Sequence, residues 1–338
     1  MIKRRQLIAL LIAYGISSLL PAIAAQPAAG IRVEKLNYFE IRVSDIDKSL
    51  VFYQQLLGMP VQSRSSDRIL LKIGELNQYL AIRPLQAGES PAITQLGYSV
   101  QNYDLETQLT ALKENGFQEI APPDITLPGI ENTMSTWIDR QENMPTLYFS
   151  DARGLIVRLT DPSWCGGEGP LGNSCSALEN VPAGVIQLDE INHFTSFVND
   201  GAGANLFYQE FFDLEIQAYQ GPGSPVTGIG DGKQFVMYAG PFPGGENAPA
   251  NIHHVSFNLE GFDVDDLLSR LESQGITDRG ERQTGPMMHY ISLRMPARGG
   301  VEGGTPEVYF TDPDGILMQL QDTTYCGGGG YLGNECLK

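Results

Sequence analysis

Two of the chain's four histidines, His193 and His254, are the residues best suited to hold a metal ion. Neutral imidazole is the commonest transition-metal ligand, and both residues lie in short segments with the alternating pattern of a strand. Since 61 positions separate them, a shared site requires two strands that lie side by side. The alternative is a pair of buried histidines in a cavity that holds no metal.

The sequence around these residues is the second copy of an internal duplication. Leu36-Asn37-Tyr38-Phe39 returns 155 residues later as Ile191-Asn192-His193-Phe194. Tyr148-Phe149-Ser150-Asp151 returns 161 residues later as Tyr309-Phe310-Thr311-Asp312, and a glycine-rich stretch bounded by two cysteines follows each. The chain is therefore a tandem repeat of about 150 residues per half, the usual size of a domain.

The duplication allows equivalent positions to be compared within this one chain. At three strand positions expected to face inward, the pairs are Tyr38 and His193, Gln95 and His254, and Arg158 and Gln319. Only the second half has two histidines at these positions. The comparison predicts that any metal chemistry belongs to the second half and that the first half is structural.

Each half divides again into two units of the order β-α-β-β-β. In the first unit an alternating strand ends near Val43, Asp45 is a helix N-cap candidate, and Gly58 stops an amphipathic helix. Further helices are expected near residues 105–115 and 264–273. The third and fourth units begin at Ile191 and Ile252.

This unit order, with Asn192-His193-Phe194-Thr195-Ser196-Phe197, His253-His254-Val255-Ser256-Phe257 and Tyr309-Phe310-Thr311-Asp312-Pro313-Asp314-Gly315, resembles the vicinal oxygen chelate superfamily. That superfamily includes glyoxalase I, bleomycin-resistance proteins and extradiol ring-cleavage dioxygenases. The resemblance implies an α+β fold in which four βαβββ units form two domains with open β-cups. The expected domains are residues 31–178 and 185–338.

The resemblance also implies a metal site. His193 and His254 stand at the family's metal-ligand positions, and the divalent ion would be Fe, Mn or Zn. The third ligand of the family is usually a Glu four residues after the Gly of Asp-Pro-Asp-Gly, where this chain has Gln319. An amide oxygen can still coordinate, but it brings no negative charge to a hard divalent ion.

Two further residues are candidates for catalysis. Tyr309 stands where extradiol dioxygenases carry a tyrosine that contacts the substrate, although its copy Tyr148 favours a packing role. The acid-base histidine that those enzymes place shortly before His254 is missing. His289 is the remaining candidate, with a packing role as the alternative, and His253 is expected to face away from His254 because neighbours on a strand alternate.

Two functions follow from these residues. The first is a metal-dependent enzyme, extradiol dioxygenase-like or another lyase or isomerase, that acts on a small oxygenated substrate. Its ion would bind two adjacent substrate oxygens as a Lewis acid or activate oxygen as Fe(II). The alternative is a metal-free protein that binds or sequesters a small molecule in its cup, which the missing Glu and the missing acid-base histidine favour.

The four cysteines predict two local disulfides. Cys165 and Cys175 have the same spacing as Cys326 and Cys336, which favours one bridge within each loop. Zinc ligation and a clasp between the halves are the alternatives.

The N-terminus predicts export. Lys3-Arg4-Arg5 precedes an apolar run over residues 7–20, and Pro21-Ala22-Ile23-Ala24 is a small-x-small cleavage pattern. The run is shorter than the roughly 20 residues of a membrane span, so residues 1–24 are expected to be a signal peptide of the general or twin-arginine kind, without a membrane anchor. The expected location is the periplasm or the secreted fraction. A net charge of −18, which falls further on cleavage, argues against a nucleic-acid partner.

Overall fold

The computed structural model of the protein describes residues 30–123, 133–140, 144–240, 249–282 and 284–337. The predicted signal peptide, residues 1–24, lies outside these ranges. Within them, no helix has both the length and the apolar content needed to cross a membrane.

The first half folds as two successive units. Its elements are β1 (Val33–Val43), α1 (Ile46–Leu57), β2 (Val61–Arg64), β3 (Ile69–Ile73), β4 (Gln78–Pro84), β5 (Ala92–Val100), α2 (Leu105–Glu114), β6 (Gln118–Glu119), β7 (Ser135–Asp139), β8 (Thr146–Ser150) and β9 (Ile156–Thr160).

The second half repeats this order. Its elements are β10 (Glu190–Phe197), α3 (Gly201–Phe212), β11 (Ile216–Tyr219), β12 (Pro225–Gly228), β13 (Phe235–Ala239), β14 (Asn251–Leu259), α4 (Val264–Ser273), β15 (Thr277–Asp278), β16 (Met288–Arg294), the 3-10 helix η1 (Pro296–Arg298), β17 (Thr305–Thr311) and β18 (Leu317–Asp322). The β-α-β-β-β order is confirmed, and the second and fourth units each carry an additional two-residue strand, β6 and β15.

The helix ends follow from the residues that the sequence singled out. The Asp45 side chain accepts hydrogen bonds from two backbone N–H groups of the first turn of α1, and Gly58 ends that helix with a φ of 64°. In α4 the N-cap is Asp263, and Gly275 has a φ of 78° two residues after the last helical residue. Both glycines adopt the left-handed conformation that a side chain would strain.

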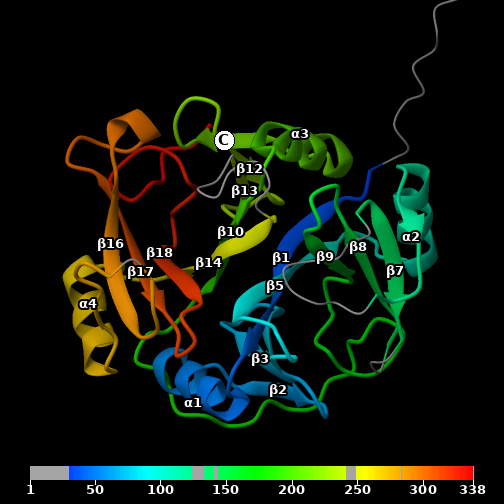
Figure 1. Ribbon diagram of the computed structural model, residues 1–338, viewed down its shortest axis with the longest axis horizontal. Coiled ribbons are helices and arrows are strands. Elements are labelled where there is room, and N and C mark those ends of the chain that lie inside the picture. Colours follow the sequence, from blue (N-terminus) through cyan, green and yellow to red (C-terminus); the bar gives the residue numbers. More distant parts are fainter. Residues whose placement is uncertain (1–29, 124–132, 141–143, 241–248, 283, 338) are drawn as a thin grey trace, which may run out of the picture.

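The first strand of each unit organises the sheet. β1 pairs in parallel with β4 and antiparallel with β5, and β5 pairs in parallel with β9. The second half has the same pairings, β10 with β13 and β14, and β14 with β18. A single residue pair, Ile93 and Ile252, joins β5 to β14 near the middle of the molecule (Figure 1). The domain boundaries at residues 31–178 and 185–338 stay a prediction.

Alternation along the central strands separates a shared core from the two cups. The Phe39 ring centroid lies 6.1 Å from that of Phe194 and 5.9 Å from that of Phe257, and both halves bury one continuous apolar cluster. The opposite faces carry smaller clusters. One contains Tyr38 and belongs to the first half, and the other contains Phe235 and belongs to the second. We call these two faces the first cup and the second cup.

Two reciprocal tyrosine–aspartate hydrogen bonds interlock the halves. Tyr53 on α1 donates to Asp312 Oδ2 of the second half over 3.0 Å, and Tyr208 on α3 donates to Asp151 Oδ2 of the first half over 3.2 Å. In each aspartate, Oδ1 accepts two backbone N–H groups of the following turn. The helix of one half therefore fastens a buried turn of the other.

Asp312 is expected to make stability fall as pH rises from about 4 to about 6. Burial raises the pKa of Asp312 to about 6, although backbone and Tyr53 donors work against it. Because the unfolded carboxyl titrates near 3.9, the folded state holds the proton more tightly, and this contribution is lost as pH rises through the folded pKa.

Asp312→Asn removes this titration. We expect the free energy of unfolding of the wild type, minus that of the variant, to be about 2 kcal/mol larger at pH 4.5 than at pH 7.5. The estimate follows from the pKa difference at roughly 1.4 kcal/mol per pKa unit. Urea unfolding of both proteins at the two pH values measures the difference, and parallel pH profiles would contradict the assignment.

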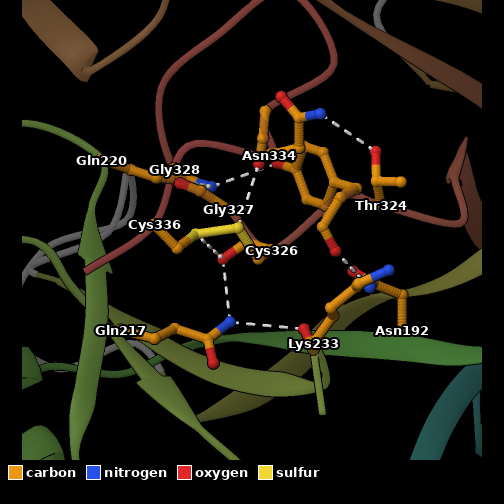
Figure 2. The surroundings of a disulfide bond; sticks show 12 residues. Asn192, Gln217, Gln220, Lys233, Thr324, Cys326, Gly327, Gly328, Asn334 and Cys336 are labelled. Carbon is orange, nitrogen blue, oxygen red and sulfur yellow. Dashed lines mark hydrogen bonds between the residues drawn. A yellow bond between two sulfur atoms is a disulfide. The ribbon is translucent and has the colours of Figure 1, made fainter. Parts of the chain in front are cut away.

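The two predicted local disulfides are confirmed. Cys165 is bonded to Cys175 and Cys326 to Cys336, and no cysteine is left for zinc ligation or for a clasp between the halves. Each loop contains one short antiparallel bridge, Glu168 with Ser174 and Gly329 with Glu335. Figure 2 shows the second loop, where the Gln217 amide donates to the Cys326 carbonyl over 2.8 Å.

Loss of either disulfide is expected to lower the free energy of unfolding by about 3 kcal/mol, the chain-entropy value for a loop of this length. Each pair of cysteines replaced by serine, Cys165→Ser with Cys175→Ser or Cys326→Ser with Cys336→Ser, measures one bridge by urea unfolding. A non-reducing peptide map that shows free thiols in the wild type would contradict the pairing.

Candidate metal centre

One row of side chains crosses the sheet of the second half. The strand registers place Ser256 between His193 and Gln319, and Gln319 between Ser256 and Tyr309. Residues in register on neighbouring strands point to the same face, as does His254, two residues before Ser256. The structure thus brings His193, His254, Gln319 and Tyr309 together in the second cup, from strands β10, β14, β18 and β17.

The two imidazoles point at one another. His193 Nε2 lies 3.3 Å from His254 Nε2, and both side chains are buried. Their other ring nitrogens are engaged elsewhere, because His193 Nδ1 lies 2.7 Å from Asn192 Oδ1 and His254 Nδ1 lies 2.9 Å from His253 Nδ1. This leaves the Nε2 atoms as the pair that converges on one point.

Both imidazoles are held neutral. Burial lowers the pKa of His193 to about 3, and it lowers the pKa of His254 well below the usual value with help from His253 and His193. Neutral imidazole is the form that binds a metal, so no proton has to leave at physiological pH.

Gln319 lies beside both imidazole rings, and its side chain raises the pKa of His193 and of His254, in opposition to burial. Its side chain is buried, yet neither Oε1 nor Nε2 makes a hydrogen bond of good geometry. A buried polar atom without a partner costs about 1–3 kcal/mol. A ligand that coordinates or hydrogen-bonds the amide would remove this cost.

Tyr309 is held by a buried carboxylate that the sequence analysis missed. The Tyr309 hydroxyl donates to Glu307 Oε2 over 3.3 Å. The pKa of Tyr309 is raised well above 10, mainly by burial and to a lesser extent by the charge of Glu307. Arg294 Nε donates to Glu307 Oε1 over 3.0 Å, so the carboxylate is already in an ion pair. The spacing of two residues between Glu307 and Tyr309 on one strand was the available signal, because it puts both on one face.

Aromatic rings line the cup on both sides of the histidines. The Phe235 ring stacks on His193 at 4.2 Å, and Tyr325 lies 5.8 Å from the same ring. On the other side, the rings of Tyr290 and Tyr309 stack at 4.9 Å. Aromatic rings therefore surround the two histidines and fix their positions.

His289 does not reach the second cup. It precedes Tyr290, whose ring faces the cup, and so it points to the opposite face, where its Nε2 lies 3.4 Å from Glu272 Oε1. This corrects the expectation that it is the acid-base candidate. His253 leaves the row as expected and packs on Phe197 at 4.3 Å, but its Nδ1 still contacts His254.

An arginine occupies the equivalent position in the first cup. The registers match Arg158 to Gln319 and Tyr38 to His193, as the internal comparison assumed. The buried guanidinium of Arg158 lies 3.9 Å from the Trp164 ring centroid and 4.6 Å from that of Tyr38. A fixed cation of the chain itself therefore lies in the first cup at the position that matches Gln319.

The residues of the second cup fit a divalent ion. Metal–nitrogen bonds of about 2.1 Å let one ion touch two nitrogens 3.3 Å apart, and the buried amide of Gln319 beside them adds an oxygen donor. The set lacks a carboxylate. Across the described residues, no three His, Cys, Asp or Glu side chains are grouped so that they could hold a metal.

Paired βαβββ units around open cups define the vicinal oxygen chelate fold. A model of the Glyoxalase/Bleomycin resistance protein/Dioxygenase superfamily matches residues 35–126 and 190–320, one region in each half, and the chain belongs to that family as a tandem two-domain member. No curated protein is matched by the sequence.

Solved structures of extradiol dioxygenases share this fold. Homoprotocatechuate 2,3-dioxygenase from Brevibacterium fuscum, in complex with 3,4-dihydroxyphenylacetate, is 17% identical with a TM-score of 0.59, over 88% of this chain and 83% of that one. The enzyme from Arthrobacter globiformis is 16% identical with a TM-score of 0.58, over 86% and 80%. Family and neighbours are those of dioxygenase- and glyoxalase-like enzymes, and at this identity the likeness shows the fold.

Proposed function

We propose that the protein is a divalent-metal-dependent enzyme of the extradiol dioxygenase-like type, whose ion is Fe, Mn or Zn. His193, His254 and Gln319 hold the ion, and the substrate is a small molecule with two adjacent oxygens. The observation that carries the proposal is the convergence of two neutral imidazoles to 3.3 Å beside a buried amide that makes no hydrogen bond of good geometry.

The ion, when bound, supplies a Lewis acid for the two oxygens or a centre that activates oxygen. The chain's own groups bind and orient the substrate. Tyr309 keeps its proton because burial and the nearby Glu307 raise its pKa well above 10, so it is not a base. Its hydroxyl donates to Glu307, and its oxygen can accept a hydrogen bond from the substrate.

A ring-cleavage reaction is one possibility within this proposal, and lyase or isomerase chemistry on an enolisable substrate is the other. The Brevibacterium fuscum neighbour binds 3,4-dihydroxyphenylacetate, an aromatic diol, which makes diols the first substrates to try. The chain's two remaining histidines, His253 and His289, both lie outside the row of the second cup. Proton transfer is therefore assigned to the substrate and solvent.

A metal-free protein that binds a small molecule is the second candidate. Gln319 in place of a carboxylate favours it, because a neutral ligand set attracts a hard divalent ion less strongly. In that case the histidines and Tyr309 contact the ligand directly.

Metal analysis separates the two candidates. Protein purified without chelator is expected to contain about one divalent ion per chain, and oxygen uptake or a new absorption band is expected with a panel of aromatic diols. A protein that contains no metal, takes up none from Fe(II), Mn(II) or Zn(II), and binds a diol equally well in the presence of chelator would overturn the enzyme proposal.

We also propose that the protein is exported, with its mature end near Ala25, and that its domains span residues 31–178 and 185–338. The two disulfides support an oxidising compartment. Mass spectrometry of the protein from the periplasmic or secreted fraction tests the first point, and an intact Met1 on cytosolic protein would contradict it.

A further inference from the structure

Asn192 lies in a β-bulge that turns its side chain toward His193. The register of β10 against β14 shifts between Ile191 and His193, and the first half has the same shift between Leu36 and Tyr38. A bulge re-aims the side chain of its additional residue. In the second half, this brings Asn192 Oδ1 to 2.7 Å from His193 Nδ1.

The C-terminal disulfide loop fixes which way the Asn192 amide points. Asn192 Nδ2 donates to the Tyr325 carbonyl over 2.9 Å, immediately before Cys326 (Figure 2). A backbone carbonyl can only accept, so the nitrogen of the amide must face Tyr325 and the oxygen must face His193. An amide oxygen also only accepts, and His193 must therefore carry its proton on Nδ1.

That tautomer leaves the lone pair of His193 on Nε2, the atom that faces His254. The opposite tautomer would place a proton where a metal ion has to bind. His254 is not fixed in this way, because its Nδ1 faces His253 Nδ1, which can donate or accept.

The loop itself is held by residues around the cup. Gln217 Nε2 donates to the Cys326 carbonyl over 2.8 Å, and Arg294 Nη2 donates to the Gly328 carbonyl over 2.8 Å. The Tyr325 hydroxyl donates to Glu307 over 3.2 Å. The carbonyl that orients Asn192 is therefore placed by the disulfide loop and its contacts.

We propose that the Cys326–Cys336 loop is the positioning element of the site: through Tyr325 and Asn192 it sets the tautomer of His193 that binds metal. That the ligand is a metal ion rests on the proposed function, whereas the assignment of the His193 tautomer does not depend on it. The first half is the internal contrast. There Asn37 Nδ2 donates over 2.7 Å to the Thr160 hydroxyl, a group that can both accept and donate. The residue that follows Asn37 is Tyr38, which has no tautomer to set.

The test compares matched variants in the two halves. Asn192→Ala, and separately Cys326→Ser with Cys336→Ser, are expected to lower Co(II) and Zn(II) affinity about 10- to 100-fold, the usual effect of removing a partner of a metal-binding histidine. Asn37→Ala, and Cys165→Ser with Cys175→Ser, should cost similar stability without changing affinity. Asn192→Asp keeps an oxygen toward Nδ1 and should restore binding in chains that fold.

Nitrogen NMR of the metal-free protein, labelled at histidine, reads the tautomer directly. The wild type and the first-half variants should show the His193 proton on Nδ1. In Asn192→Ala the proton should no longer prefer Nδ1. This variant tests the inference independently of the cysteine variant, which need not fold for the comparison. An unchanged tautomer in Asn192→Ala, or equal loss of affinity from both halves, would overturn the inference. A wild type that binds no metal removes the proposed function, while the NMR result still decides the role of the loop.

Discussion

His193→Ala and His254→Ala are each expected to abolish bound divalent metal, together with any activity that depends on it. The two Nε2 atoms converge to 3.3 Å, and two neutral imidazoles with one amide oxygen form a minimal donor set. Loss of one imidazole leaves a single nitrogen and a neutral oxygen, which cannot hold a divalent ion against water at micromolar concentration. Metal per folded chain, measured after gel filtration, checks this result.

Equivalent changes in the first half are the control. Gln95→Ala and Tyr38→Ala remove buried side chains from the positions that match His254 and His193, so they disturb packing without touching the proposed ligands. Metal content per folded chain should stay at the wild-type value in both. If the first-half variants lose as much metal as the histidine variants, the histidine variants act by disturbing the fold and not by removing ligands.

The order of the elements could be predicted because local rules and global fold agree. Asp45 and Gly58 are an N-cap and a left-handed stop, and both act in the structure as the sequence indicated. The duplication predicted the remaining strands, because a segment that repeats in the second half indicates a strand even when it is too short for a clear periodicity. The short strands β6 and β15 were not predicted, since two residues carry no periodicity.

The candidate residues came from the internal comparison and from the family resemblance. His193 and His254 stood out because their copies are Tyr38 and Gln95, and Gln319 was chosen because it stands at the family's third ligand position. That these three residues bind a metal stays a prediction. Glu307 and Arg294 did not stand out, because a buried ion pair is recognised only when two strands are seen side by side. For His289 the expectation was wrong by one position, since the next residue, Tyr290, is the one that faces the cup.

The two cups differ in the charge of the side chain at the position of Arg158 and Gln319. In the first cup the Arg158 guanidinium lies among the rings of Tyr38, Tyr148 and Trp164, so the cation there is part of the chain. A guanidinium among aromatic faces gains cation–π attraction and needs no ligand from solution. In the second cup, Gln319 is uncharged and burial keeps the histidines neutral, so the proposed cation would come from solution.

Gln319→Glu is expected to tighten divalent-ion binding by the order of 10²-fold, or about 2.8 kcal/mol at 1.4 kcal/mol per tenfold change. The carboxylate completes a set of two histidines and one acid and adds a negative charge in contact with the ion. Without metal the same charge is buried among neutral groups, so the metal-free variant should unfold at a lower temperature than the wild type. Competition with a chelator of known affinity measures the binding.

Gln321→Glu is the matched control for this gain. Gln321 is also buried and lies on the same face of β18, but two residues along the strand, roughly 6.6 Å away. A general attraction of cations to an added charge would strengthen binding in both variants, whereas coordination strengthens it in Gln319→Glu alone. If the wild type holds no metal and Gln319→Glu acquires none, the two imidazoles do not form a metal site. The second cup is then a pocket whose histidines and Tyr309 contact an organic ligand directly.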